Sequence, residues 1–181
     1  MLTQEIVKTY QGLIDSLDYD LVEKAAEFIK GAPLTVFCGN GGSYAVATHM
    51  AGDLLINTTL SGSALALGDN LVSFSALSND VDYASAMACE LRCRLNGVKG
   101  GSPVVVLIST SGRSLNVVKA GEVAREFGCL VVSLTGSYTK ALAPLSHLTI
   151  PVASLDAGLV ESVHAFLGHV LVKIIGKEPP E

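Results

Sequence analysis

The chain has 181 residues, of which 49% are hydrophobic and 16% are charged, so it can bury one substantial core and is predicted to form a single domain, 1–181. That composition excludes a disordered chain. The net charge of -5 argues against a nucleic-acid partner, because such affinity depends on clustered lysine and arginine. A small phosphorylated ligand is compatible, since backbone N–H groups and hydroxyls can hold it.

The predicted elements alternate along the chain. Residues 3–30 carry apolar side chains at helical spacing with a possible break at 18–20, which predicts one long or two shorter leading helices. Five short apolar runs follow and predict strands: "LTVFC", "ALAL", "PVVVLI", "CLVVSL" and "LTIPV". Helical periods lie between and after them, over 42–57, 80–95, 113–127 and 157–177. Apolar strands that alternate with helices indicate a covered parallel sheet. We therefore predict an α/β fold, a three-layer α/β/α sandwich with a parallel sheet of about five strands.

The last helical segment is apolar, but Glu161, His164 and His169 interrupt it. It therefore lacks the uninterrupted run of about 20 apolar residues that a membrane span needs, and no membrane association is expected. His164 is expected to pack or bond structurally.

The four cysteines are Cys38, Cys89, Cys93 and Cys129, and none is in CxxC spacing. No signal-peptide pattern precedes the first amphipathic segment. We expect reduced, mostly buried thiols in a cytoplasmic protein. Cys89 and Cys93 share a helix face at i, i+4 and could bind metal, although core packing is the favoured interpretation.

Three loops after predicted strands are candidates for chemistry, because ligands bind beyond the carboxyl ends of parallel strands. Residues 39–43, "GNGGS", combine glycines that admit a ligand closely with a helix N-terminus. Residues 109–114, "STSGRS", form a hydroxyl-rich turn that also opens a helix. Residues 78–80, "SND", stand at a predicted helix start. Each loop alone has an ordinary explanation, since glycine turns also serve packing and Asn79 and Asp80 could be helix caps.

His49 and Asp53 follow the glycine loop four residues apart, so they project from one helix face. An imidazole and a carboxylate at this spacing suit a zinc-type ion. A local helix pair without a ligand is the alternative.

Taken together, "GNGGS", "LISTSGRSLNVVKA" and "LVVSLTG", in this order, resemble the sugar isomerase (SIS) domain family over nearly the whole chain. Within that family the likeness is to phosphoheptose isomerase, a homotetramer with sites at subunit interfaces. His49 with Asp53, Asn79-Asp80 and "VESVHAFLGH" carry this narrower resemblance, the last being similar to a Gln-Glu-x-His-x-x-x-x-His signature.

The resemblance implies a sugar-phosphate ligand and a divalent metal, with zinc expected. The substrate-binding residues that it implies, with Ser43 added as a possible member of the anion cradle, are Asn40, Gly41, Gly42, Ser43, Asn79, Asp80, Ser109, Thr110, Ser111, Ser114 and Glu161. The metal and acid–base positions are His49, Asp53, Glu161 and His169, with Asp53 and His169 sharing the proton transfers.

Glu161 and His169 are eight residues apart, which is about 12 Å along a helix. They can hardly bind one ion from one regular helix. Either Glu161 lies outside the regular helix, or the two residues serve sites contributed by different subunits.

The chain departs from the family pattern at four positions. Asp53 stands where glutamate is usual, which retracts a base by one methylene, and Glu161 replaces glutamine, which adds a negative charge. Asn57 and Leu159 replace arginines that would contact the substrate.

Two functions follow from these observations. The first is a metal-assisted ketose–aldose isomerase acting on a sugar phosphate, most specifically sedoheptulose 7-phosphate to glycero-manno-heptose 7-phosphate through an enediol. The second is a non-catalytic SIS module that binds a sugar phosphate or a protein, resembling the replication regulator DiaA. Retention of all four metal and acid–base positions favours the enzyme, and the lost arginines favour the scaffold.

The leading segment also predicts self-association. Residues 3–30 carry more apolar surface than is needed to cover the chain's own sheet, and surplus apolar helix surface marks an interface. We expect a homotetramer built around these helices.

Overall fold

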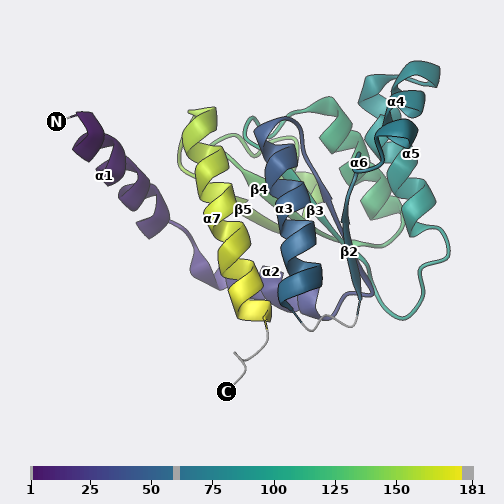
Figure 1. Ribbon diagram of the computed structural model, residues 1–181, viewed down its shortest axis with the longest axis horizontal. Coiled ribbons are helices and arrows are strands. Elements are labelled where there is room, and N and C mark those ends of the chain that lie inside the picture. Colours follow the sequence, from purple (N-terminus) through teal and green to yellow (C-terminus); the bar gives the residue numbers. More distant parts are fainter. Residues whose placement is uncertain (1, 59–61, 177–181) are drawn as a thin grey trace.

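The computed structural model describes residues 2–58 and 62–176. Five parallel strands form one sheet in the order β2-β1-β3-β4-β5, with helices on both faces (Figure 1). The strands are β1 (Leu34–Cys38), β2 (Ser63–Ala66), β3 (Val104–Ser109), β4 (Leu130–Thr135) and β5 (Leu148–Pro151). The helices are α1 (Leu2–Asp15), α2 (Tyr19–Lys30), α3 (Gly42–Asn57), α4 (Leu71–Asp80), α5 (Tyr83–Leu95), α6 (Leu115–Glu126), α7 (Ala157–Ile175) and the 3-10 helix η1 (Ala143–Leu145). The predicted three-layer α/β/α sandwich is confirmed.

The sheet separates two hydrophobic cores, because successive side chains of a strand point to opposite faces. Phe37 of β1 belongs to the core formed with α2, α3 and α7. Its neighbours Val36 and Cys38 belong to the core formed with α5 and α6. The central strands β1 and β3 are buried along their whole length, which explains why they appear in the sequence as continuous apolar runs.

Helix α7 is, among the described residues, the one helix with the length and hydropathy to cross a membrane. Its apolar stripe, which includes Val160, Leu167 and Leu171, is buried in the core with α2 and α3. Packing against the sheet therefore accounts for the hydropathy of this helix.

The second helical layer differs from the sequence expectation around residue 80. Asn79 and Asp80 end α4, and α5 begins at Tyr83 after Asp82, whose carboxylate accepts from the Ser85 N–H as N-cap. The expected helix start at Asp80 was therefore wrong. Helix α4 itself was not predicted, because it buries none of its residues and contacts the core through the half-buried Phe74, so its apolar pattern is weak.

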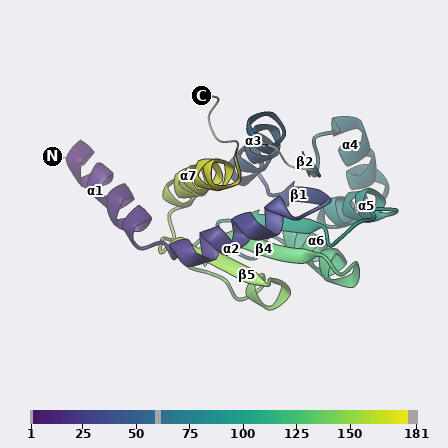
Figure 2. The same cartoon turned by 90° about the horizontal axis from the view of Figure 1, so that it is seen from below.

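The leading segment forms two helices, with the break at the expected place. Asp18 is the N-cap of α2, and its carboxylate accepts from the Leu21 N–H at 3.3 Å. Helix α2 packs on α7, whereas α1 extends away from the body of the molecule (Figures 1 and 2). Leu13 is the one buried residue of α1, and the Tyr10 hydroxyl lies 3.2 Å from the Ser162 hydroxyl.

All four cysteines are free thiols. Cys38 and Cys129 are buried, and burial raises the pKa of Cys38 to about 12 and that of Cys129 to about 11, which makes both unreactive. Cys89 is half-buried and Cys93 is exposed, so the expectation of mostly buried thiols holds for only part of the set.

His164 is a fully buried histidine of α7, as a structural role requires. Its Nε2 lies 3.2 Å from the Thr135 carbonyl oxygen, and its Nδ1 has no hydrogen-bond partner among the described residues. Burial lowers the pKa of His164 from 6.5 to about 4. The fold therefore keeps the His164 imidazole neutral at pH 7.

The buried His164 should make stability depend on pH. As pH falls through 6.5 the unfolded chain takes up a proton that the folded chain accepts only near 4, so stability is lost over that window. Between pH 7.5 and 5, the free energy of unfolding should fall by about 2 kcal/mol more in the native protein than in His164→Gln. Urea titrations at a fixed protein concentration measure the difference, and equal losses in both proteins would contradict it.

Candidate active site

The loops after β1 and β3 lie at the point where the order of successive strands in the sheet reverses. Strands β1 and β3 are neighbours, but α3 leaves β1 on one face and α6 leaves β3 on the other. Such a reversal, at the carboxyl edge of a parallel sheet, is a common position for ligand binding. Helices α3 and α6 both begin without a side-chain cap, whereas α2, α4, α5 and α7 begin with a capping Asp or Asn. The first N–H groups of α3 and α6 therefore have no acceptor from a capping side chain.

The glycine loop depends on close backbone approaches. Gly41 has a φ of 55°, a conformation that favours glycine. A Cβ on Gly39 would lie 2.8 Å from the Ser43 backbone, and one on Gly42 would collide with the Glu161 carboxylate. Ser43 is buried in the first turn of α3. Packing and backbone conformation alone therefore require glycine at these positions.

Asn40 is fixed by a reciprocal pair of amide hydrogen bonds. Its Nδ2 donates to Asn116 Oδ1 at 2.9 Å, and Asn116 Nδ2 donates to Asn40 Oδ1 at 2.8 Å. The Tyr83 hydroxyl also donates to Asn40 Oδ1, at 2.8 Å. Asn116 is buried in α6, so this pair joins the loop after β1 to the helix after β3. Sequence reasoning missed Asn116 and Tyr83; the signal for Asn116 was a polar residue on an otherwise buried helix face.

The serine loop after β3 presents the predicted hydroxyl cluster. Ser109 and Ser114 have their Oγ atoms 3.3 Å apart, and Ser114 is the N-cap position of α6 without capping it. Gly112, with a φ of 62°, packs on the Tyr138 carbonyl, and the Arg113 guanidinium lies 5.6 Å from the Tyr138 ring centre. Thr110 and Ser111, the other predicted members, are half-buried in the same turn.

Asn79 and Asp80 are exposed at the end of α4, and Asn79 Nδ2 donates to Asp80 Oδ1 at 2.8 Å. They precede Tyr83, whose hydroxyl reaches Asn40, so the α4–α5 turn lies near the glycine loop. A pocket of about 410 Å³ opens there. Its walls include the aromatic side chains of Tyr44, Phe74 and Tyr83, which sequence reasoning did not single out.

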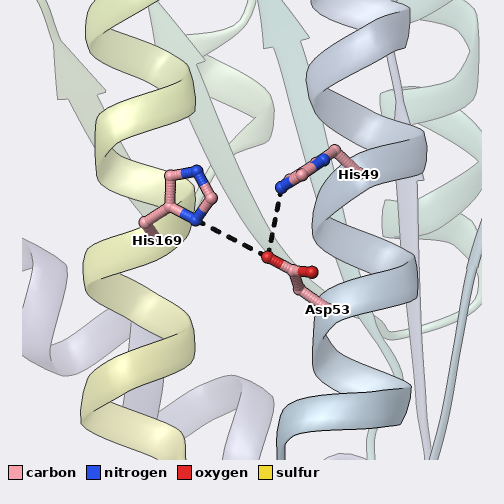
Figure 3. A group of neighbouring side chains, drawn as sticks. All are labelled: His49, Asp53 and His169. Atoms are coloured by element: carbon pink, nitrogen blue, oxygen red, sulfur yellow. Dashed lines mark ion pairs between the residues drawn. The ribbon is translucent and has the colours of Figure 1, made fainter.

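His49, Asp53 and His169 converge between α3 and α7 (Figure 3). Asp53 Oδ2 lies 3.2 Å from His49 Nε2 and 3.5 Å from His169 Nδ1. The two imidazole rings meet edge to face, with centroids 5.0 Å apart. Both are more than half exposed, while the Asp53 side chain is 24% exposed. These three residues form the one group of three or more potential metal ligands in the described part of the chain.

The position of Asp53 depends on two neighbours. Asn57, which replaces the family's arginine, donates from Nδ2 to Asp53 Oδ1 at 3.3 Å and leaves Oδ2 facing the imidazoles. Gly168 lies against Met50, since a Cβ on it would be 2.8 Å from Met50 Cγ. This close packing of α7 on α3 lets the short Asp53 side chain reach His169.

The three donor atoms lie within 4.8 Å of one another, and two of their separations suit a tetrahedral zinc ion. Ligand bonds of 2.0–2.2 Å place neighbouring donor atoms about 3.4 Å apart. The observed separations of 3.2 and 3.5 Å from Asp53 Oδ2 match that value. Three protein ligands would leave one position for a water or substrate oxygen, as in catalytic zinc sites.

Glu161 does not join this group within one chain. It lies in the regular part of α7, two turns before His169, and its carboxylate contacts Gly42 at the start of α3. The explanation that Glu161 lies outside the regular helix is therefore wrong. Leu159, at the other missing arginine, packs its side chain against the core.

This fold and these loops define a parallel α/β/α protein with a pocket beside the glycine loop after its central strand β1. The chain belongs to the SIS domain family, whose model matches residues 4–136.

Phosphoheptose isomerases are among the proteins that this chain resembles. The chain is 37% identical to the phosphoheptose isomerase of Solidesulfovibrio magneticus over 143 residues, which are 77% of this chain and 68% of that enzyme. It is 31% identical to the phosphoheptose isomerase of Helicobacter pylori strain 26695 over 175 residues, 95% of this chain and 88% of that enzyme. The solved phosphoheptose isomerase from Neisseria gonorrhoeae superposes with a TM-score of 0.82 at 27% identity, covering 96% of this chain and 94% of that one. The predicted likeness to phosphoheptose isomerase is confirmed.

Proposed function

We propose that this protein is a ketose–aldose isomerase that converts sedoheptulose 7-phosphate to glycero-manno-heptose 7-phosphate in the cytoplasm. The observation that carries the proposal is the convergence of His49, Asp53 and His169 in a chain 37% identical to a phosphoheptose isomerase. A scaffold would need neither the imidazoles nor the carboxylate. The free cysteines agree with a reducing compartment.

His49, Asp53 and His169 would hold the divalent ion, with zinc expected. When bound, the ion would act as a Lewis acid on the substrate oxygens. Isomerisation moves one proton between adjacent carbons through an enediol and a second proton between the oxygens, which needs a base and an acid. We assign these transfers to Asp53 and His169, each through the carboxylate oxygen or ring nitrogen that does not bind the ion; the two side chains lie side by side, with Oδ2 and Nδ1 3.5 Å apart.

The first test combines metal content with turnover. Native protein should bind about one zinc ion per chain and isomerise sedoheptulose 7-phosphate. Asp53→Asn and His169→Ala should each lower turnover by about a hundredfold or more, because each removes a proton-transfer group. His147→Gln is the matched histidine control, since His147 pairs with Arg125 away from the group and should keep full zinc content and turnover.

The outcomes separate the two functions. A metal-free, inactive native protein would support a non-catalytic sugar-phosphate or protein-binding module, the reading that the absent arginines at Asn57 and Leu159 favour. Zinc binding without turnover of this substrate would keep the site and direct the search to another sugar phosphate.

We assign the phosphate to the serine loop, where the hydroxyls of Ser109, Thr110, Ser111 and Ser114 gather at the uncapped start of α6. Ser111→Ala with Ser114→Ala should weaken sedoheptulose 7-phosphate binding by roughly 1 to 3 kcal/mol, because charge-assisted hydrogen bonds are lost. Calorimetric titration measures the change. Ser75→Ala, a serine of exposed α4 surface, is the control and should bind as the native chain does. A bound phosphate located elsewhere in a crystal would contradict the assignment.

We also propose that the chain forms a homotetramer through α1 and the outer face of α3 and α7. Apolar side chains are exposed on all three helices, including Ile6, Ile56 and Ile174. The imidazoles of His49 on α3 and His169 on α7 are more than half exposed and would be covered by such an association. Sedimentation at micromolar concentration should give a tetramer, and Ile6→Asp should shift it toward smaller species. A monomeric native chain would remove this interface.

A further inference from the structure

The two uncapped helix starts differ in charge. The start of α6 carries hydroxyls and Arg113, a cation. The start of α3 carries Glu161, which reaches it from α7. Among the described residues, no cation forms an ion pair with Glu161. The start of α6 therefore has a positive side chain beside it and the start of α3 a negative one.

The Glu161 carboxylate occupies the space that a side chain at position 42 would fill. A Cβ on Gly42 would lie 2.1 Å from Glu161 Oε2 and 2.7 Å from Oε1, so the glycine makes room for both oxygens. The positive end of the α3 dipole stabilises a negative group at this position. The chain thus places its own anion where a ligand anion would otherwise bind.

A carboxylate at this point restricts the ligand. It accepts hydrogen bonds and cannot donate them, whereas the glutamine that is usual in the family can do both. A phosphate or carboxylate brought beside Glu161 would meet like charge. A hydroxyl can donate to it, and the single phosphate is then directed to the serine loop.

We infer that Glu161 is a specificity-determining residue that limits the ligand to one anionic group, bound at the α6 end, with a hydroxyl-bearing end at α3. This inference rests on the proposed sugar-phosphate function. It predicts rejection of sugar bisphosphates and of phosphorylated sugar acids.

The experiment compares the binding of sedoheptulose 7-phosphate and sedoheptulose 1,7-bisphosphate by calorimetry, independently of turnover. The native protein should bind the monophosphate about tenfold or more tightly than the bisphosphate, because of like-charge repulsion. In Glu161→Gln the ratio should fall to about threefold or less, through tighter binding of the bisphosphate. Glu122→Gln, an exposed glutamate of α6, changes net charge equally and should keep the native ratio. Glu161→Ala replaces the glutamine variant if that variant does not fold.

Each result decides the inference. A native protein that binds both ligands equally, or a ratio that Glu161→Gln and Glu161→Ala leave unchanged, would overturn the role of Glu161 and leave the proposed function intact. A native protein that binds neither ligand would overturn the phosphate assignment and this inference together.

Discussion

The paired amides of Asn40 and Asn116 hold the candidate site together. They join the loop that leads into α3, on one face of the sheet, to α6, on the other face, through two hydrogen bonds of 2.9 and 2.8 Å. Asn116 is buried, so loss of Asn40 would leave its amide with only the Val117 N–H and the Met87 sulfur as partners, which costs more than one exposed hydrogen bond contributes. The placement of the serine loop against the glycine loop depends on this pair.

Close helix packing explains how the chain tolerates its shorter carboxylate. Gly168 precedes His169, and the absence of its side chain lets α7 settle on Met50 of α3. The imidazole is thereby brought within 3.5 Å of Asp53, although aspartate is one methylene shorter than the family's glutamate. Asn57 fixes the other carboxylate oxygen, so a residue that replaces a substrate contact has a positioning role. Substitutions that look like losses in the sequence therefore form one consistent local arrangement.

Periodicity predicted the sheet and most helices because buried strands and core-facing helices leave strong apolar patterns. It failed at α4, which buries no residue and leaves no such pattern. The i, i+4 pair of His49 and Asp53 could be predicted from helix geometry, and His169 only from family resemblance. The contacts of Asn116 and Tyr83 with Asn40, and of Glu161 with Gly42, could not be predicted, because each depends on how elements far apart in sequence pack against one another.

The projection of α1 from the body has a consequence for how the folded chain responds to dilution. Isolated helices shorter than about 12 to 15 residues are marginal in water, and α1 has 14 residues with only Leu13 buried on its own subunit. Its backbone hydrogen bonds are therefore protected mainly by whatever covers its exposed side. The proposed homotetramer would cover that side, so amide exchange in α1 should follow protein concentration while exchange in β1 and β3 does not, and a protease should cleave the dissociated chain first ahead of Asp18.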